Sequence, residues 1–132
     1  MLTDYKYRKA RNIIKTARIS DRGKEMLFCA VRNYRTKSVP ETGLFQRKVG
    51  KTTKACLVGA AIADKMGGFL PENEAYVTEW EAKASHEFGI KESSIENLIC
   101  GFDNATSDEF DMYKGSSYAQ VGKKLSLLLV NR

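Results

Sequence analysis

The feature that most constrains the fold of this sequence is a segment near its middle, residues 52–66, that is nearly all apolar or small. Gly67 and Gly68 follow it directly, as is typical of a helix end. A helix that is apolar on every side is stable only where other elements surround it. We therefore expect a central helix over residues 52–66, with the rest of the chain packed around it.

Other segments carry the apolar spacing of amphipathic helices, namely residues 4–19, 72–88, 94–101 and 117–130. Residues 24–36 contain an apolar block that fits a helix, and a short strand near residues 26–34 is the alternative. The pattern predicts an all-α domain of five or six helices that spans residues 1–132. An α+β fold follows if the strand forms instead.

Capping and turn residues set the expected boundaries. Thr3 or Asp4 suits the start of the first helix, and Gly23 suits its termination after Ser20. Pro71 and Gly89 flank residues 72–88 at the two positions that helix geometry favours. The segments 37–43 and 103–116 are expected to be loops.

Composition and cysteine placement exclude several classes of protein. No run of about 18 apolar residues is present, so we expect no membrane span. The charged N-terminus is unlike a signal peptide. Cys29, Cys56 and Cys100 are odd in number and each lies among apolar residues, which is typical of buried reduced thiols in a cytoplasmic protein. No motif for a metal or another cofactor is present, and we expect none.

Charge is distributed unevenly along the chain. Residues 1–54 hold 15 Lys and Arg against 4 Asp and Glu, whereas residues 55–132 hold 7 against 12, within a net charge of +6. Such asymmetry indicates an anionic partner, or a basic half and an acidic half that attract each other within one fold.

The sequence Gly50-Lys51-Thr52 resembles the end of a phosphate-binding loop. That motif requires a further glycine at position 45, where this chain has Phe45, which does not adopt the positive φ of the loop without strain. The motif is therefore excluded. Two readings remain for Lys51 and Thr52: an anion site at the start of the helix 52–66, or a plain Thr cap with solvated lysines.

A basic stripe runs along the first predicted helix. Its members follow one another at steps of three and four residues, which places them along one helix face: Arg8, Arg11, Lys15, Arg18 and Arg22. Arg32 and Arg35 flank Tyr34 in a second basic segment, and arginine beside aromatic residues suits phosphate contact and base stacking. A solvated face, or pairing with the acidic half, is the alternative.

The remaining polar features have structural explanations. The acidic residues Asp103, Asp108, Glu109 and Asp111 lack the spacing of a calcium loop and are expected to be solvated or to pair with the basic helix. His86 stands near a helix end, where the dipole favours a cation. Ala55, Gly59 and Ala63 are spaced for close internal packing, so we expect Gly59→Leu to unfold the domain.

The segments ACLVGAA, EFGI and ICGFDNA, within residues 55–125, resemble small bacterial and phage proteins of unassigned function. The resemblance implies an all-α accessory protein and transfers no activity or catalytic residue.

Together these features predict a non-enzymatic binding protein whose basic face contacts nucleic acid or an acidic protein surface. The first alternative is a phage- or bacterium-encoded inhibitor or adaptor that docks on a host or defence complex. The second is a protein that sequesters nucleotides at Lys51 and Thr52. A homo-oligomer is compatible with each.

Overall fold

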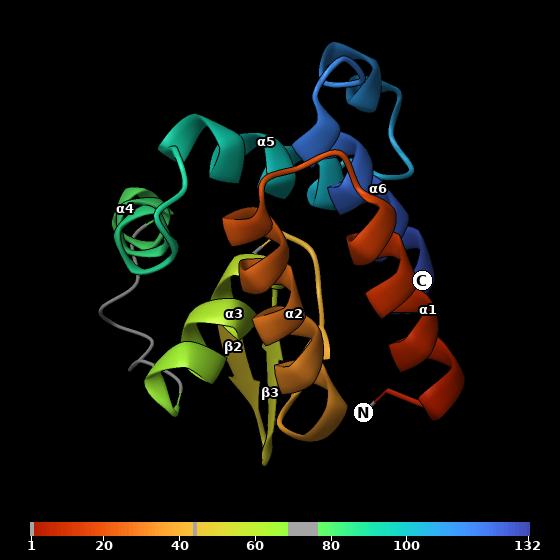
Figure 1. The fold of residues 1–132 in the computed structure, drawn as a ribbon. Coiled ribbons are helices and arrows are strands. Elements are labelled where there is room, and N and C mark those ends of the chain that lie inside the picture. Colours follow the sequence, from red (N-terminus) through yellow and green to blue (C-terminus); the bar gives the residue numbers. More distant parts are fainter. Residues whose placement is uncertain (1, 44, 69–76) are drawn as a thin grey trace.

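The computed structural model describes residues 2–43, 45–68 and 77–132. Over these residues it contains six α-helices and a small three-stranded sheet, so the protein is mostly helical (Figure 1). The all-α prediction therefore holds only roughly, and the α+β alternative fits better. The strand of that alternative was misplaced, because residues 26–34 are helical and the strands lie elsewhere.

Helices α1 (Asp4–Thr16) and α2 (Asp21–Thr36) form a hairpin of helices. The Thr3 side chain caps α1 by accepting a hydrogen bond from the backbone N–H of Lys6, as predicted. Ser20 caps α2 in the same way, accepting from the N–H of Gly23. The prediction that Gly23 ends a helix is wrong: it lies inside α2, where an added Cβ would collide with the Tyr118 side chain.

The sheet consists of β1 (Ser38–Pro40), β2 (Gln46–Val49) and β3 (Thr52–Ala55), in the order β1-β3-β2. Strand β3 pairs in parallel with β1 and antiparallel with β2. Gly50 and Lys51 form the tight turn between β2 and β3. Two expectations are thus corrected, since residues 38–40 of the expected loop form a strand and residues 52–55 of the expected helix form another.

The predicted central helix is present as α3 (Leu57–Met66), and it begins at Leu57 rather than Thr52. Every residue from Leu57 to Ala63 is buried, as its all-round apolar character predicts. Cys56 is the cap residue, and its Sγ accepts from the N–H of Gly59 at 3.5 Å. Gly67 ends the helix at φ 78° in the left-handed region.

The second half contains α4 (Val77–Phe88), α5 (Glu92–Asp103), the 3₁₀ helix η2 (Asp108–Met112) and α6 (Ser117–Leu129). These helices confirm the periodic segments, although η2 adds a helical turn where only a loop was expected. Gly89 follows α4 at φ 67°, as predicted for a helix terminator. Pro71 and the expected start of α4 at residue 72 lie outside the described residues.

One hydrophobic cluster joins the six α-helices. Its largest fully buried side chain is Trp80 of α4, whose ring stacks on Phe45 with centroids 5.4 Å apart. Helices α2 and α3 occupy the centre, α4 lies on one side, and α1 and α6 lie on the other (Figure 1). None of the helices described is long and apolar enough to cross a membrane.

Candidate functional site

Three basic segments that are far apart in the sequence meet at one end of the molecule, which we call the basic end. The start of α1 is tied to the end of α2, because the backbone N–H of Leu2 donates to the carbonyl of Tyr34 at 3.3 Å. The end of α2 leads directly into β1, which pairs with β3 so that Ser38 lies opposite Thr53. Figure 1 shows the start of α1, the end of α2 and the β2–β3 hairpin at this end. The cations of these segments are Lys6, Arg8, Lys9, Arg35, Lys37, Arg47, Lys48, Lys51 and Lys54.

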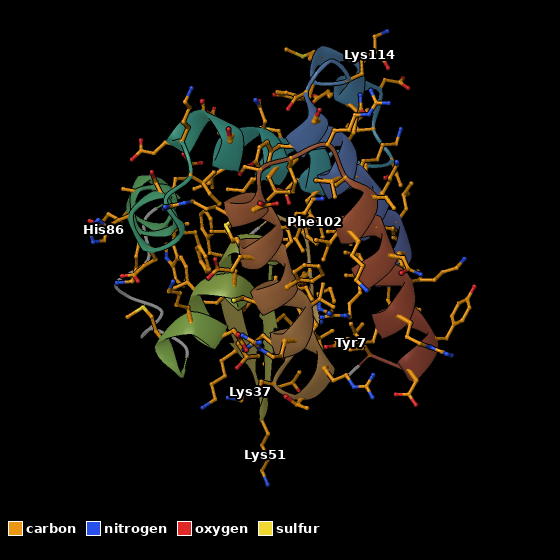
Figure 2. The ribbon with its side chains drawn as sticks, viewed as in Figure 1. Tyr7, Lys37, Lys51, His86, Phe102 and Lys114 are labelled. Atoms are coloured by element: carbon orange, nitrogen blue, oxygen red, sulfur yellow. The ribbon has the colours of Figure 1, made fainter. Side chains whose placement is uncertain are left out.

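The β2–β3 hairpin is the most projecting part of the basic end. Its turn has a positive φ at Gly50, 62°, and at no non-glycine residue, which is the Gly-X pattern of a type II′ hairpin turn. Lys51 follows at the tip and points away from the body of the protein (Figure 2). Lys51 and Thr52 are both exposed. The glycine that suggested a phosphate-binding loop therefore makes a hairpin.

This hairpin removes the physical basis of one predicted anion site. The site required the free backbone N–H groups of a helix that starts at Thr52, and no helix starts there. The plain-cap reading of Thr52 is wrong for the same reason, because the cap of α3 is Cys56. Lys51 and Thr52 remain candidate contacts only as members of an exposed basic strand pair.

Two like charges face each other across the hairpin. Arg47 lies directly opposite Lys54 in the register of β2 and β3. Directly opposed like charges destabilise a sheet, so this pair requires compensation. Glu41 supplies part of it, accepting from Arg47 Nη2 at 2.7 Å.

At the start of α1, two predicted arginines stack on one aromatic ring. The guanidinium of Arg35 lies 4.6 Å from the Tyr7 ring centroid and that of Arg11 lies 5.7 Å from it. Arg11 also lies 4.7 Å from the Phe28 ring, and Arg35 forms an ion pair with Asp4. Both side chains are half-buried, so these contacts orient them.

The predicted five-residue stripe does not form a continuous line. Helix α1 ends at Thr16, so only Arg8, Arg11 and Lys15 share it. Arg18 lies after the helix, on a cavity of about 110 Å³ between the end of α1 and the start of α6. Arg22 lies in the first turn of α2, next to Gly89. The stripe failed because Ala17 is extended and Ser20 starts a new helix.

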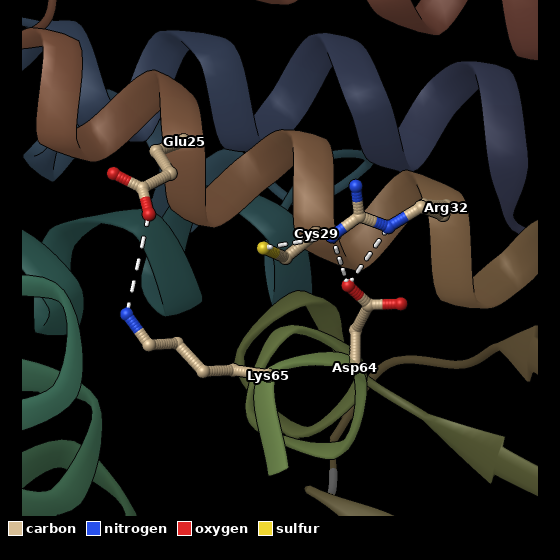
Figure 3. Close-up of polar contacts among 5 residues, drawn as sticks. All are labelled: Glu25, Cys29, Arg32, Asp64 and Lys65. Atoms are coloured by element: carbon tan, nitrogen blue, oxygen red, sulfur yellow. Dashed lines mark hydrogen bonds and ion pairs between the residues drawn. The ribbon is translucent and has the colours of Figure 1, made fainter. Parts of the chain in front are cut away.

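Arg32 is engaged in a clamp between α2 and α3 (Figure 3). Its Nε and Nη2 donate to Asp64 Oδ2 at 3.0 and 2.6 Å, and Nη2 lies 3.6 Å from Cys29 Sγ. The Asp64 side chain is only 11% exposed, and its hydrogen bond raises the pKa of Arg32. Lys65 reaches Glu25 at 4.0 Å across the same pair of helices. Arg32 thus satisfies a nearly buried carboxylate while its own side chain stays 64% exposed, and its role in anion binding stays a prediction.

The three cysteines are free, as predicted. Burial raises the pKa of Cys56 to about 12, and burial together with Asp64 raises that of Cys29. Cys100 is only partly buried, and its thiol pKa is also raised, chiefly by burial. All three therefore stay protonated near neutral pH and are poor nucleophiles.

Three of the acidic residues of the second half lie together away from the basic end. Asp108, Glu109 and Asp111 are exposed on η2, beside Lys114, which Figure 2 shows at the opposite end from Lys51. Among residues 2–43, 45–68 and 77–132, no group of three possible ligands is placed to hold a metal ion. His86 is exposed in the last turn of α4, where the dipole favours a cation.

Ion pairs of the described residues both join the two halves and lie within the basic half. Of the ion pairs among the described residues, Arg32–Asp64 and Lys65–Glu25 join the two halves, whereas Arg35–Asp4 and Arg47–Glu41 lie within the basic half. Attraction between the two halves therefore stays an alternative explanation of the charge asymmetry, beside an anionic partner.

Comparison with protein-family models, curated proteins and solved structures finds no significant match. The resemblance of residues 55–125 to small bacterial and phage proteins stays a prediction.

Proposed function

We propose that this protein binds nucleic acid through its basic end. The observation that carries the proposal is the convergence of cations from α1, α2 and the hairpin on one end, with Asp4 and Glu41 as the acidic partners there. A polyanion interacts with all of these cations at once and releases its condensed counterions, which makes such a surface favourable for phosphate backbones.

The arrangement of the aromatic residue supports nucleic acid over a smaller anion. Arg11 and Arg35 are held on the Tyr7 ring, so their remaining donors are oriented before binding and less side-chain entropy is lost on contact. An acidic protein surface, as in the inhibitor or adaptor hypothesis, offers the same charge and is an outcome of the test below. Nucleotide sequestration is not proposed, because its helix start is absent.

The test is a titration of a fluorescently labelled 20-mer duplex with the purified protein, read by anisotropy, from about 50 to 300 mM salt. We expect the logarithm of the affinity to fall linearly with the logarithm of salt, with a slope of about −0.9 per phosphate contact. The double variant Arg8→Ala/Lys37→Ala should weaken binding and reduce the slope by about 2.

The matched control is Lys91→Ala/Lys114→Ala, which removes the same charge from exposed residues away from the basic end. It should leave the slope unchanged. Equal effects of the two double variants would show a response to net charge alone and would contradict the proposal. Absence of any binding at about 50 mM salt would also overturn it and would leave an acidic protein as the partner to test.

A further inference from the structure

We infer that the β2–β3 hairpin is a reading element that enters the major groove of duplex DNA. This inference rests on the proposed function and names the kind of nucleic acid and the part that enters it. The inference is based on one observation: the exposed face of the hairpin contains groups that can contact base edges as well as cations that can contact phosphates.

The sheet register fixes which side chains share that face. Residues directly opposite each other lie on one side, so the pairs Arg47–Lys54 and Val49–Thr52 point the same way. The other face contains Ala55, which is fully buried, and therefore points to the core. Val49 is apolar and points away from the hydrophobic cluster of the protein. Its side chain is therefore left 47% exposed.

The dimensions of the hairpin tip suit the major groove of undistorted B-DNA. Strand β1 pairs with β3 from Thr53 to Ala55, so the hairpin is a free two-stranded ribbon only at its tip, residues 49–52. The two strands of this tip lie about 4.8 Å apart, and a B-DNA major groove about 12 Å wide and 8.5 Å deep admits it. The B-DNA minor groove, about 6 Å wide, is too narrow for it. The major groove of an RNA duplex is deep and narrow, so side chains on a ribbon do not reach its bases.

The chemistry of the tip fits base edges. The ammonium of Lys51 can donate to guanine O6 and N7, the Thr52 hydroxyl can donate or accept, and Val49 can contact a thymine methyl group. Lys37, adjacent in register to the hairpin, and Arg35 behind it are then placed toward the flanking phosphates. The opposed pair of Arg47 and Lys54 lies behind the tip, where Val39 of β1 also pairs with Lys54, and would face the sugar–phosphate backbones at the entrance of the groove, whose negative charge offsets the repulsion.

The experiment compares three probes of one sequence, namely duplex DNA, duplex RNA and single-stranded DNA, at one salt concentration. We expect the wild-type protein to bind duplex DNA about tenfold more tightly than duplex RNA. The variant Lys51→Ala/Thr52→Val should lose this preference while it retains the weaker binding to all three probes. Arg8→Ala/Lys37→Ala should weaken all three probes equally and keep the preference.

Backbone amide shifts provide a readout that does not depend on affinity. In ¹H–¹⁵N spectra, duplex DNA should shift the amides of residues 47–54 more than those of α6, and a thermal melt of each variant confirms that it folds. Equal affinity for duplex RNA, or unshifted hairpin amides on a probe that does bind, would overturn the hairpin inference and leave the proposed function standing. Failure of every probe to bind would overturn the proposed function itself.

Discussion

Asp103 is the last residue of α5, and its Oδ1 accepts a hydrogen bond from the backbone N–H of Gly43 at 2.9 Å. Burial raises the pKa of this carboxyl above its usual 3.8, and the Gly43 bond only partly offsets the rise. The folded state therefore holds the proton more tightly than the unfolded state. As pH rises through the interval above 3.8, the folded state becomes charged and loses stability relative to the unfolded state.

We therefore expect Asp103→Asn to raise the melting temperature at pH 7 by about 2–4 °C, because it removes a desolvated charge and keeps an oxygen acceptor for Gly43. The gain should vanish near pH 3, where the wild-type carboxyl is protonated in the folded state and largely so in the unfolded state. Scanning calorimetry of both proteins at the two pH values measures the difference. A variant that is less stable at pH 7 would show that the Gly43 bond outweighs the desolvation.

At the scale of an element, α3 is fixed in place by a glycine. A Cβ added at Gly59 would collide with the carbonyl oxygen of Phe45, which is backbone and cannot rotate away. The same carbonyl accepts from the N–H of Cys56 at 3.2 Å, and the Phe45 ring stacks on Trp80. Phe45, the residue directly before β2, therefore contacts both the start of α3 and Trp80 of α4, and it holds these elements together.

Gly59→Ala should lower the free energy of unfolding by about 3 kcal/mol, even though alanine favours a helix by about 1 kcal/mol. Gly68→Ala is the matched control, because an added Cβ meets no atom of the described residues within 4 Å and its φ is not in the left-handed region. Urea denaturation of the two variants gives the comparison. Equal stabilities would mean that the backbone at Phe45 moves aside without loss.

The helices were predictable because their apolar residues repeat at 3.6-residue spacing and their caps are local. The start of α2 was missed because Gly23 was interpreted as a helix end. The glycine instead makes room for the Tyr118 side chain, which is distant in the sequence. The hairpin was missed because QRKV and TTKA have little apolar alternation to reveal a strand. A signal was present nonetheless, as Gly50-Lys51 between the β-branched residues Val49 and Thr52 is a Gly-X hairpin turn.

The same distinction between local and distant information applies to the candidate site. The sequence identified the basic half correctly as a matter of composition, and it placed Arg8, Arg11 and Lys15 together on one helix. It could not show that Arg32 forms an ion pair with Asp64, because tertiary packing determines which charged residues meet. It also could not show that Lys37 and Lys51 belong to one surface, because strand order is not encoded locally.

For the whole molecule, the property that decides the response to salt is the excess of cations over the acids Asp4 and Glu41 at the basic end. Cations at the basic end repel one another, and the exposed acids of η2 lie too far away to neutralise them at physiological salt, where the screening length is about 8 Å. If the two halves instead stabilised the fold by mutual attraction, added salt would weaken it. The response of stability to salt therefore has a sign that distinguishes these two arrangements.

We expect the melting temperature to rise by about 3 °C or more between about 10 and 150 mM NaCl, as the screening length falls from about 30 to 8 Å. Lys37→Ala/Lys51→Ala should flatten this rise, because it removes part of the repulsion at the basic end. Lys91→Ala/Lys114→Ala makes the same change in net charge away from that end and should leave the rise in place. Scanning calorimetry of the wild-type protein and the two double variants, without nucleic acid, measures the melting temperature at each salt concentration. A melting temperature that falls with salt would show that attraction between the halves dominates, and the basic end would then have less unbalanced charge to offer a polyanion.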